Sequence, residues 1–368
     1  MSEYKNIRGF KIQSLSSSPA SSRYGGGAWA SGGTMNTGRD AFCCDSMGTQ
    51  TAALAAGGRT TVDIGNTESY NGTAWTEVNN LNTARSNGYG TGSSTVAFTG
   101  FGFAQPANIT NTEVWNGTGW TEVNNGNTAR RHGGAFGGTT DGIAAGGNSD
   151  VATTESWNGT NWTTVTSLNV GRSQLSGLGT SNTVGLCAGG GGPAPAGGPT
   201  AVEQWDGSSW TEIAELNTGR TSGAGSGPST LGIISGGNNV TPGIAVAVTE
   251  LWNGTTWTEL ADLGTATGRM SASGGSGGAA SAVSFGGYAA PTSVKVATSF
   301  EWTAPAVFTP TNQGQLFYAS TPDDFNITAA PASGGAWASG GTMTDSRKQL
   351  AGDGIQTAAI AMGGDVTA

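Results

Sequence analysis

The sequence predicts an all-β protein built from repeated four-stranded units, and three observations lead to this prediction. Gly occupies 65 of 368 positions and charged residues make up only 11% of the chain, and no stretch carries the 3.6-residue apolar period of a long helix. Twelve Trp residues and regular short apolar runs favour many strands joined by tight turns. A repeat of about 40–50 residues has the size of one blade of a β-propeller.

Each repeat is marked by a Trp that is followed, usually ten residues later, by an Arg. The segment TESYNGTAWTEVNNLNTAR at 67–85 recurs, for example as TESWNGTNWTTVTSLNVGR at 154–172, and AWASGGTMNTGR at 28–39 has a near copy at 336–347. The pair at 257 and 269 is two residues further apart than the others. The predicted structural repeat positions are Trp29, Trp75, Trp120, Trp162, Trp210, Trp257, Trp337, Arg39, Arg85, Arg130, Arg172, Arg220, Arg269 and Arg347.

Each unit is predicted to contain four strands, A to D. Strand A follows the Arg, and strand B is an apolar run that ends in a Gly pair, as in TAALAAGG at 51–58. Strand C is TESY or TESW, and strand D is WTEV. Asn-Gly or Asp-Gly between C and D favours a tight hairpin turn, and this turn explains the recurring Asn-Gly-Thr sequence without glycosylation.

The Gly pair, the later aromatic residue and the Trp, with an Arg opening the next unit, together resemble the kelch repeat. The resemblance covers roughly 28–308 and 336–364. It implies a β-propeller fold, and it says little about activity because one fold hosts many functions. The N-terminal segment KNIRGFKIQS and the sequences of the repeats also resemble predicted tail or fibre proteins of marine bacteriophages.

We expect a single propeller domain, 1–368, with seven four-stranded blades. The N-terminal strands in 1–38 and the C-terminal strands in 337–368 would share one closing blade, which would hide the exposed strand edges. The repeat blades would occupy 39–301, and 302–336 would be an irregular insertion in the sixth blade. The alternative is six full blades with an open terminal half-blade.

Charge and cysteine content exclude several classes of protein. The net charge is −9 and the pI is about 4.6, which argues against a basic nucleic-acid surface. No apolar run approaches the ~20 residues of a membrane helix, and the N-terminus has no apolar signal-peptide core. Cys43, Cys44 and Cys187 form no disulfide framework. We therefore expect synthesis in a host cytoplasm without export, and no membrane insertion.

Catalytic groups are absent from the repeats. The only histidine, His132, cannot build the copper site of galactose oxidase, and the turns lack the Asp-box spacing of sialidases. We expect no enzyme activity, no metal and no cofactor. Each repeat Arg is expected to bridge to loop carbonyls or to the Glu that opens strand C, namely Glu68, Glu113, Glu155, Glu203 or Glu250. The alternative is an Arg ring that binds an anion at the channel mouth. The Trp residues are expected to pack between blades.

The connections between strands B and C vary most between units, and variable loops on a constant scaffold are where recognition usually resides. They are 59–66, 103–111, 148–153, 191–200, 238–247 and 288–298. We expect a non-enzymatic virion component, a tail-fibre or adhesion protein among other virion proteins, that recognises a host surface glycan or protein through these B–C loops. The alternatives are an intracellular kelch scaffold and an enzyme similar to galactose oxidase or sialidase.

Overall fold

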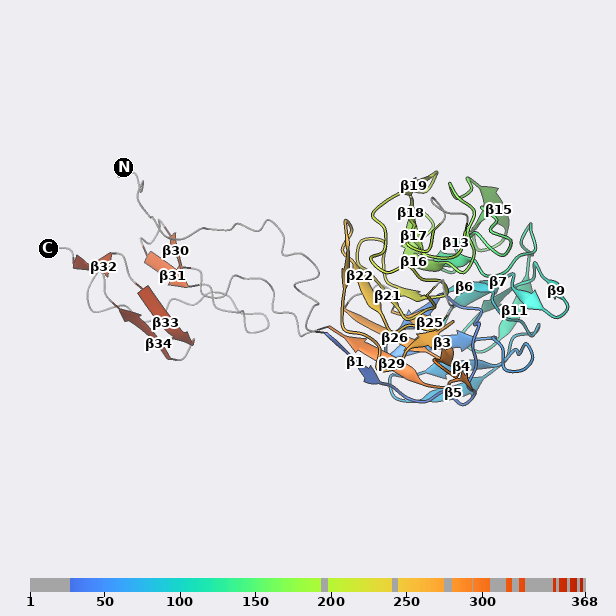
Figure 1. Cartoon of the computed structure of the whole chain (residues 1–368), viewed down its shortest axis with the longest axis horizontal. Coiled ribbons are helices and arrows are strands. Elements are labelled where there is room, and N and C mark those ends of the chain that lie inside the picture. The colour runs from blue at the N-terminus through green and yellow to red at the C-terminus, as the bar shows by residue number, and fades with distance from the viewer. Residues whose placement is uncertain are drawn as a thin grey trace. The chain divides into compact units, whose positions relative to one another are not determined.

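The computed structural model describes residues 27–304, apart from 193–197, 240–243, 275–279 and 293, and the backbone of six short strands between 316 and 366. The chain divides into two compact units, residues 1–305 and 306–368. Every regular element of the described residues is a β-strand, which confirms the predicted all-β class (Figure 1). The possible strand at 8–16 and the repeat residue Trp337 lie outside the described residues.

The first unit contains repeated four-stranded antiparallel sheets, here called groups 1 to 6. Group 1 contains β2 (Ser46–Thr49), β3 (Ala52–Ala56), β4 (Thr67–Tyr70) and β5 (Trp75–Val78). Group 2 contains β6 (Tyr89–Gly92), β7 (Ala97–Gly100), β10 (Thr112–Trp115) and β11 (Trp120–Val123). Group 3 contains β12 (Gly134–Gly137), β13 (Gly142–Ala145), β14 (Thr154–Trp157) and β15 (Trp162–Val165). Group 4 contains β16 (Ser176–Ser181), β17 (Val184–Ala188), β18 (Val202–Trp205) and β19 (Trp210–Glu212). Group 5 contains β20 (Ala224–Ser226), β21 (Gly232–Ser235), β22 (Thr249–Trp252) and β23 (Trp257–Glu259). Group 6 contains β25 (Ser271–Ser273), β26 (Ser281–Phe285), β29 (Ser299–Thr303) and β1 (Ala28–Ser31).

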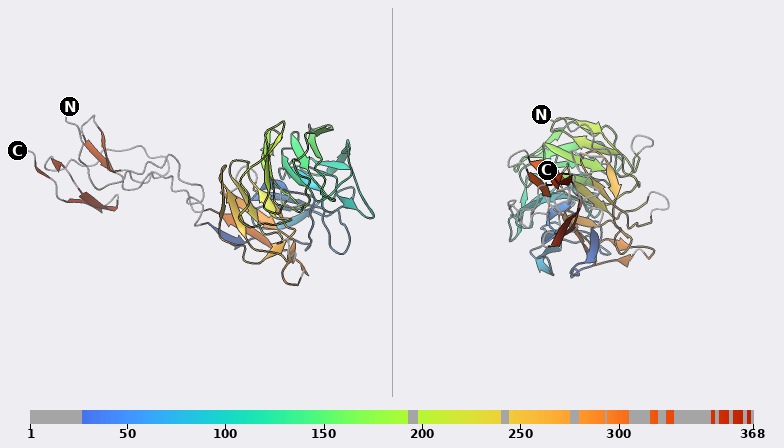
Figure 2. Two further views of the ribbon diagram at one scale, coloured as in Figure 1. Left: turned by 45° about the horizontal axis from the view of Figure 1, so that its top comes forward. Right: turned by 90° about the vertical axis from the view of Figure 1, so that its left-hand side faces the viewer.

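The first strands of neighbouring groups lie side by side. Strand β2 pairs in parallel with both β6 and β25, and contacts join β6 to β12, β12 to β16, β16 to β20, and β20 to β25. The groups follow one another in chain order, from blue through green to orange, around a common centre (Figure 1, Figure 2). We call this centre, where the first strands meet, the hub.

Five short strands lie in the loops of the first unit: β8 (Phe103–Ala104), β9 (Ala107–Asn108), β24 (Thr267–Gly268), β27 (Tyr288–Ala289) and β28 (Val294–Lys295). The second unit contains three antiparallel pairs. These are β30 (Leu316–Ala319) with β31 (Asp324–Ile327), β33 (Ala351–Ile355) with β34 (Ala358–Met362), and β32 (Arg347–Lys348) with β35 (Asp365–Val366).

The repeated Trp residues pack between groups, as expected. Trp120 is 7% exposed and lies 5.5 Å from Trp115 of its own group, ring centroid to ring centroid. Its Nε1 donates a hydrogen bond of 3.0 Å to Thr67 Oγ1 in the preceding group. Trp162 repeats this contact with Thr112 Oγ1 at 2.9 Å. Burial of a large ring with its N–H satisfied makes each Trp an anchor between two sheets.

The predicted pairing of the two chain ends in one closing blade is wrong. Strand β1 pairs instead with β29 and completes group 6, in register from Ala28 opposite Thr303 to Ser31 opposite Phe300. The physical reason is a matching edge, because Trp29 packs against Trp302 at 5.6 Å and donates to Thr249 Oγ1 at 3.0 Å. The described C-terminal strands pair with one another.

Candidate functional site at the hub

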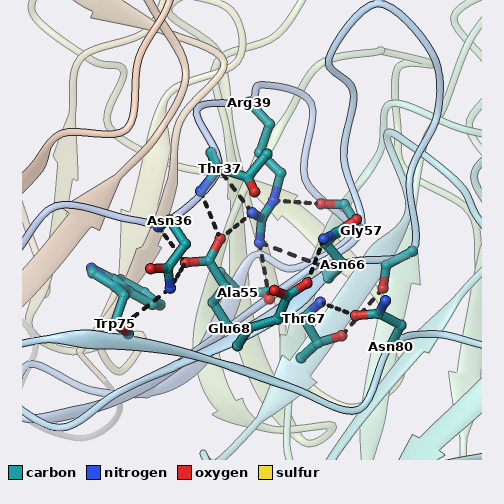
Figure 3. Close-up of polar contacts among 12 residues, drawn as sticks. Asn36, Thr37, Arg39, Ala55, Gly57, Asn66, Thr67, Glu68, Trp75 and Asn80 are labelled. Atoms are coloured by element: carbon teal, nitrogen blue, oxygen red, sulfur yellow. Dashed lines mark hydrogen bonds and ion pairs between the residues drawn. The ribbon is translucent and has the colours of Figure 1, made fainter.

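Five of the repeated Arg residues lie in buried ion pairs with the Glu of the third strand, as expected. In group 2, Arg85 Nη2 lies 2.6 Å from Glu113 Oε1, and both side chains are fully buried. Arg39 and Glu68 form the same pair in group 1, and Arg39 Nε also donates to the Gly57 carbonyl at 2.9 Å (Figure 3). The remaining pairs are Arg130–Glu155, Arg172–Glu203 and Arg220–Glu250.

These pairs join the loops to the sheets. Glu113 accepts hydrogen bonds from the backbone N–H groups of Asn82 at 2.7 Å and Thr83 at 3.1 Å. Arg85 donates to the carbonyls of Phe101 at 3.2 Å and Asn111 at 2.6 Å. A buried charge is tolerated only when it is paired and hydrogen-bonded in this way. The Arg and Glu residues are therefore structural, and the Arg ring is not available to an external anion.

Group 6 departs from this pattern, and Arg269 is not the equivalent of the other repeat Arg residues. The carbonyl of Thr267 accepts a hydrogen bond from Gly237, as the carbonyl of Arg172 does from Gly147. Phe300 pairs across the sheet as Glu68 does. Thr267 and Phe300 therefore replace the buried pair, and the longer Trp-to-Arg spacing moves the Arg two residues along the chain. The assignment of Arg269 as a structural repeat position is wrong for this reason.

A ring of six residues with left-handed backbone surrounds the hub. Each lies two residues after the repeat Arg or, in group 6, after Thr267, and the φ angles lie between 51° and 62°. Their peptide groups are linked from group to group, for example from Asn87 N–H to the Ala41 carbonyl at 2.8 Å and from Ser222 N–H to the Gln174 carbonyl at 2.8 Å. This hub ring consists of Ala41, Asn87, His132, Gln174, Ser222 and Arg269.

The repeated backbone of the hub ring contrasts with its varied side chains. Non-Gly residues with positive φ are strained by about 1 kcal/mol or more each, and six of them persist here because hydrogen bonds between the groups hold them. The side chains, in contrast, comprise a methyl group, two amides, an imidazole, a hydroxyl and a guanidinium. The scaffold thus dictates the backbone and leaves the side chains free to serve recognition.

A cavity of about 60 Å³ lies under the hub ring and reaches Asp45. Group 1 has two additional residues here, because Ala41 and Gly48 are seven positions apart where Asn87 and Gly92 are five. Such a bulge redirects a side chain at the end of a strand. The Oδ2 atom of Asp45 is shielded from solvent and has no hydrogen-bond partner. Burial raises the pKa of this carboxyl well above its usual value.

Positive charge gathers around the hub ring. Burial, followed by the nearby guanidinium groups of Arg131 and Arg269, lowers the pKa of His132 to about 4. Arg269 lies 3.8 Å from Asp40, and Lys295 lies 2.9 Å from the same carboxylate. At neutral pH the imidazole is therefore an uncharged group among cations.

The B–C loops surround the hub ring on the same side. Isolated bridges join the residue after a repeat Arg to the start of the loop, for example Ser86 to Phe103 and Thr221 to Asn238. Neighbouring loops also contact one another, since Tyr288 Oη donates to Asn238 Oδ1 at 2.7 Å and Asn108 donates to Asn148 at 3.2 Å. We call this continuous surface of loops and hub ring the loop side.

The other ends of the first strands form a second cavity of about 410 Å³. It is lined by glycines, Val96 and the hydroxyl-bearing residues Ser46, Thr91, Ser93, Thr139 and Thr180. Among the described residues, no ionisable side chain lines it. Among the described residues that line the two cavities, the charged and amide side chains thus lie on the loop side.

Within residues 27–304 and the described C-terminal strands, no group of three or more His, Cys, Asp or Glu residues could hold a metal ion. The three cysteines are free and buried, and burial raises the pKa of Cys43 to about 12 and that of Cys44 to about 11. None of the described residues belongs to a helix long and apolar enough to cross a membrane. In comparisons with known proteins, no family model and no curated relative matches the chain.

Sequence reasoning assigned structural roles to His132 and Arg269 and did not single out the other hub residues. Their signature in the sequence is variation at a fixed offset: the second position after the Arg differs in each of the units that begin with Arg39, Arg85, Arg130, Arg172 and Arg220. Asp45 could have been found from the longer first strand segment between Arg39 and the following apolar run.

Proposed function

We propose that the six groups are the blades of a kelch-like β-propeller that closes through β1. The proposal is supported by the parallel pairing of β2 with both β6 and β25 and by the placement of β1 as the fourth strand of group 6. A blade completed by strands from both parts of the sequence leaves no exposed edge. It corresponds to six blades, in place of the seven expected from counting Arg residues.

We further propose that the protein is a non-enzymatic recognition module that binds a host surface glycan or protein on its loop side. One observation carries this proposal: the side chains that vary between otherwise similar groups converge on the hub ring and its surrounding loops. Residues that differ on a constant scaffold mark the recognition surface. The loop side also holds the polar groups with free hydrogen-bonding capacity, such as the amide of Gln174.

Binding of the purified full chain to host cells and to an array of surface glycans tests this proposal. The Gln174→Ala variant should bind at least about fivefold more weakly, since a lost hydrogen bond costs about 1 kcal/mol. Thr180→Ala changes an exposed residue at the opposite cavity and should bind as the wild type does. Equal binding by both variants, or no binding by the wild type, would refute recognition on the loop side.

The virion is the proposed location, as a tail-fibre or adhesion component, and it rests on the resemblance of the repeat sequences. Mass spectrometry of purified virions tests it directly. Peptides of this chain should be present at a stoichiometry typical of tail proteins, and their absence from intact particles would contradict the placement.

A further inference from the structure

We propose that the loop side at the hub binds a carboxylate-bearing sugar, such as a uronic acid residue of an acidic glycan. The inference deepens the proposed function and rests on it for the glycan nature of the ligand. It concerns the mouth of the hub, formed by the hub ring and Arg131.

The cations that form no buried pair gather on the loop side. Residues 27–304 contain nine Arg and Lys residues, of which five lie in the buried pairs with Glu. All of the remaining four lie on the loop side, although the chain as a whole has a net charge of −9. These four are Arg59, Arg131, Arg269 and Lys295.

The carboxylates beside these cations already have partners. Asp40 forms ion pairs with both Lys295, at 2.9 Å, and Arg269, at 3.8 Å. Asp63 lies 3.6 Å from Arg59. Asp150, in the third loop, accepts a hydrogen bond of 2.8 Å from Ser173. Glu77, Glu122 and Glu215 also contact the B–C loops, through Asn66, Asn111 and Thr200, but none of the described carboxylates forms an ion pair with Arg131.

Asp45 does not cancel the remaining charge. Its raised pKa favours the neutral acid under the hub ring. His132 also remains neutral, because its pKa is lowered to about 4. The positive charge beside the imidazole therefore comes from Arg131 and Arg269.

The two Arg residues near His132 have N–H donors without a hydrogen-bond partner. The guanidinium of Arg131 stacks over Phe103 at 4.3 Å and has no ion pair among the described residues. The Nε atoms of Arg131 and Arg269 are both buried without a hydrogen-bond partner. An Arg fork with free donors suits a carboxylate, to which it can donate two parallel hydrogen bonds.

Both Arg residues are departures from the repeat. Groups 2 and 4 place Ser86 and Ser173 where group 3 has Arg131. Group 6 lacks the buried ion pair, and its Arg269 lies in the hub ring. Local departures from an otherwise consistent scaffold are expected at functional sites.

Neutral polar groups complete a surface that suits a sugar. Asn87, Gln174 and Ser222 supply two amides and a hydroxyl on the remaining sides of the hub ring. Amides and hydroxyls both donate and accept hydrogen bonds, as the hydroxyl groups of a saccharide require. In this arrangement the carboxylate of the sugar lies near the two Arg residues, and the hydroxyl groups of the sugar ring face the two amides.

The single histidine provides a direct test, because NMR signals of its imidazole arise from one residue. A bound carboxylate near His132 favours the protonated ring and raises its pKa. Glucuronic acid should therefore raise the pKa of His132 from about 4 by one unit or more. The methyl ester of glucuronic acid, which has no charge, should leave it unchanged.

Variants then assign the shift to the two Arg residues. Arg131→Ser copies groups 2 and 4, and Arg269→Gln copies Gln174 with its positive φ, so both preserve the local backbone. Each should weaken glucuronic acid binding at least about tenfold, as expected for a lost charged hydrogen bond. Thr180→Ala, at an exposed residue of the opposite cavity, is the control and should bind like the wild type.

Three results would overturn the inference: no response of His132 to glucuronic acid, an equal response to inorganic sulfate, or full binding by the Arg131→Ser and Arg269→Gln variants. The proposed function fails separately. If host cells still bind the protein while glucuronic acid does not, the loop side recognises another ligand, and the acidic-sugar inference alone is refuted.

Discussion

Breaking one buried ion pair should destabilise the protein by a large and measurable amount. Glu113→Gln leaves the Arg85 guanidinium buried without its carboxylate, and Arg85→Met leaves the Glu113 carboxylate without its cation. Removing one partner of a buried pair costs about 3–5 kcal/mol, a large part of the 5–15 kcal/mol by which a typical domain is stable.

The double variant should lose less than the sum of the two single variants. It contains no unpaired buried charge, and the amide oxygen introduced by Glu113→Gln can still accept from one of the two backbone N–H groups, of Asn82 or of Thr83, that Glu113 binds. Contacting residues in one network show coupling of up to about 3 kcal/mol, and we expect at least about 1.5 kcal/mol here.

Urea unfolding followed by Trp fluorescence measures these losses. With a denaturant slope of about 3 kcal/mol per molar urea, a loss of about 3 kcal/mol moves the midpoint by about 1 M. Single variants that lose under about 1 kcal/mol, or losses that simply add in the double variant, would refute the structural role of the pair.

Two further predictions concern ring closure and pH. Ala28 and Thr303 face each other in β1 and β29, and paired Cα atoms lie about 4.5–5.5 Å apart, a distance that a disulfide can bridge. The Ala28→Cys, Thr303→Cys double variant should therefore form a disulfide within one chain and have a higher unfolding midpoint. Cross-links that form between chains but not within one chain would contradict the pairing. Asp45→Asn should stabilise the protein increasingly as pH rises above about 4, by about 1.4 kcal/mol for each pH unit up to the folded-state pKa. The reason is that the raised folded-state pKa of Asp45 makes the stability of the wild type fall with rising pH. Parallel pH profiles of wild type and variant in thermal unfolding would disprove this role of the buried carboxyl.

Local sequence features predicted much of each sheet. Short apolar runs ending in Gly pairs, Asn-Gly turns and the Trp at the start of each fourth strand all describe contacts within one repeat or between adjacent repeats. The Arg–Glu pairs were also predictable, because Glu113 and Arg85 recur at fixed positions and a buried charge needs a partner.

Long-range pairing and backbone strain were not predictable. The choice of β29 as the partner of β1 joins segments about 270 residues apart, and the second AWASGGTM copy at 336–343 made another pairing equally reasonable. Nothing in the sequence marks Asn87 or His132 as a residue with positive φ, because this conformation depends on hydrogen bonds from neighbouring groups.

The most direct test of the account is the affinity of a hub variant for host surface glycans, measured beside its stability. Asn87, His132 and Gln174 are changed together to Ala, which Ala41 already places in the hub ring at a positive φ. We expect binding to weaken at least about tenfold, with the fold retained in circular dichroism and urea unfolding. A folded variant that binds glycans as tightly as the wild type would contradict recognition at the hub.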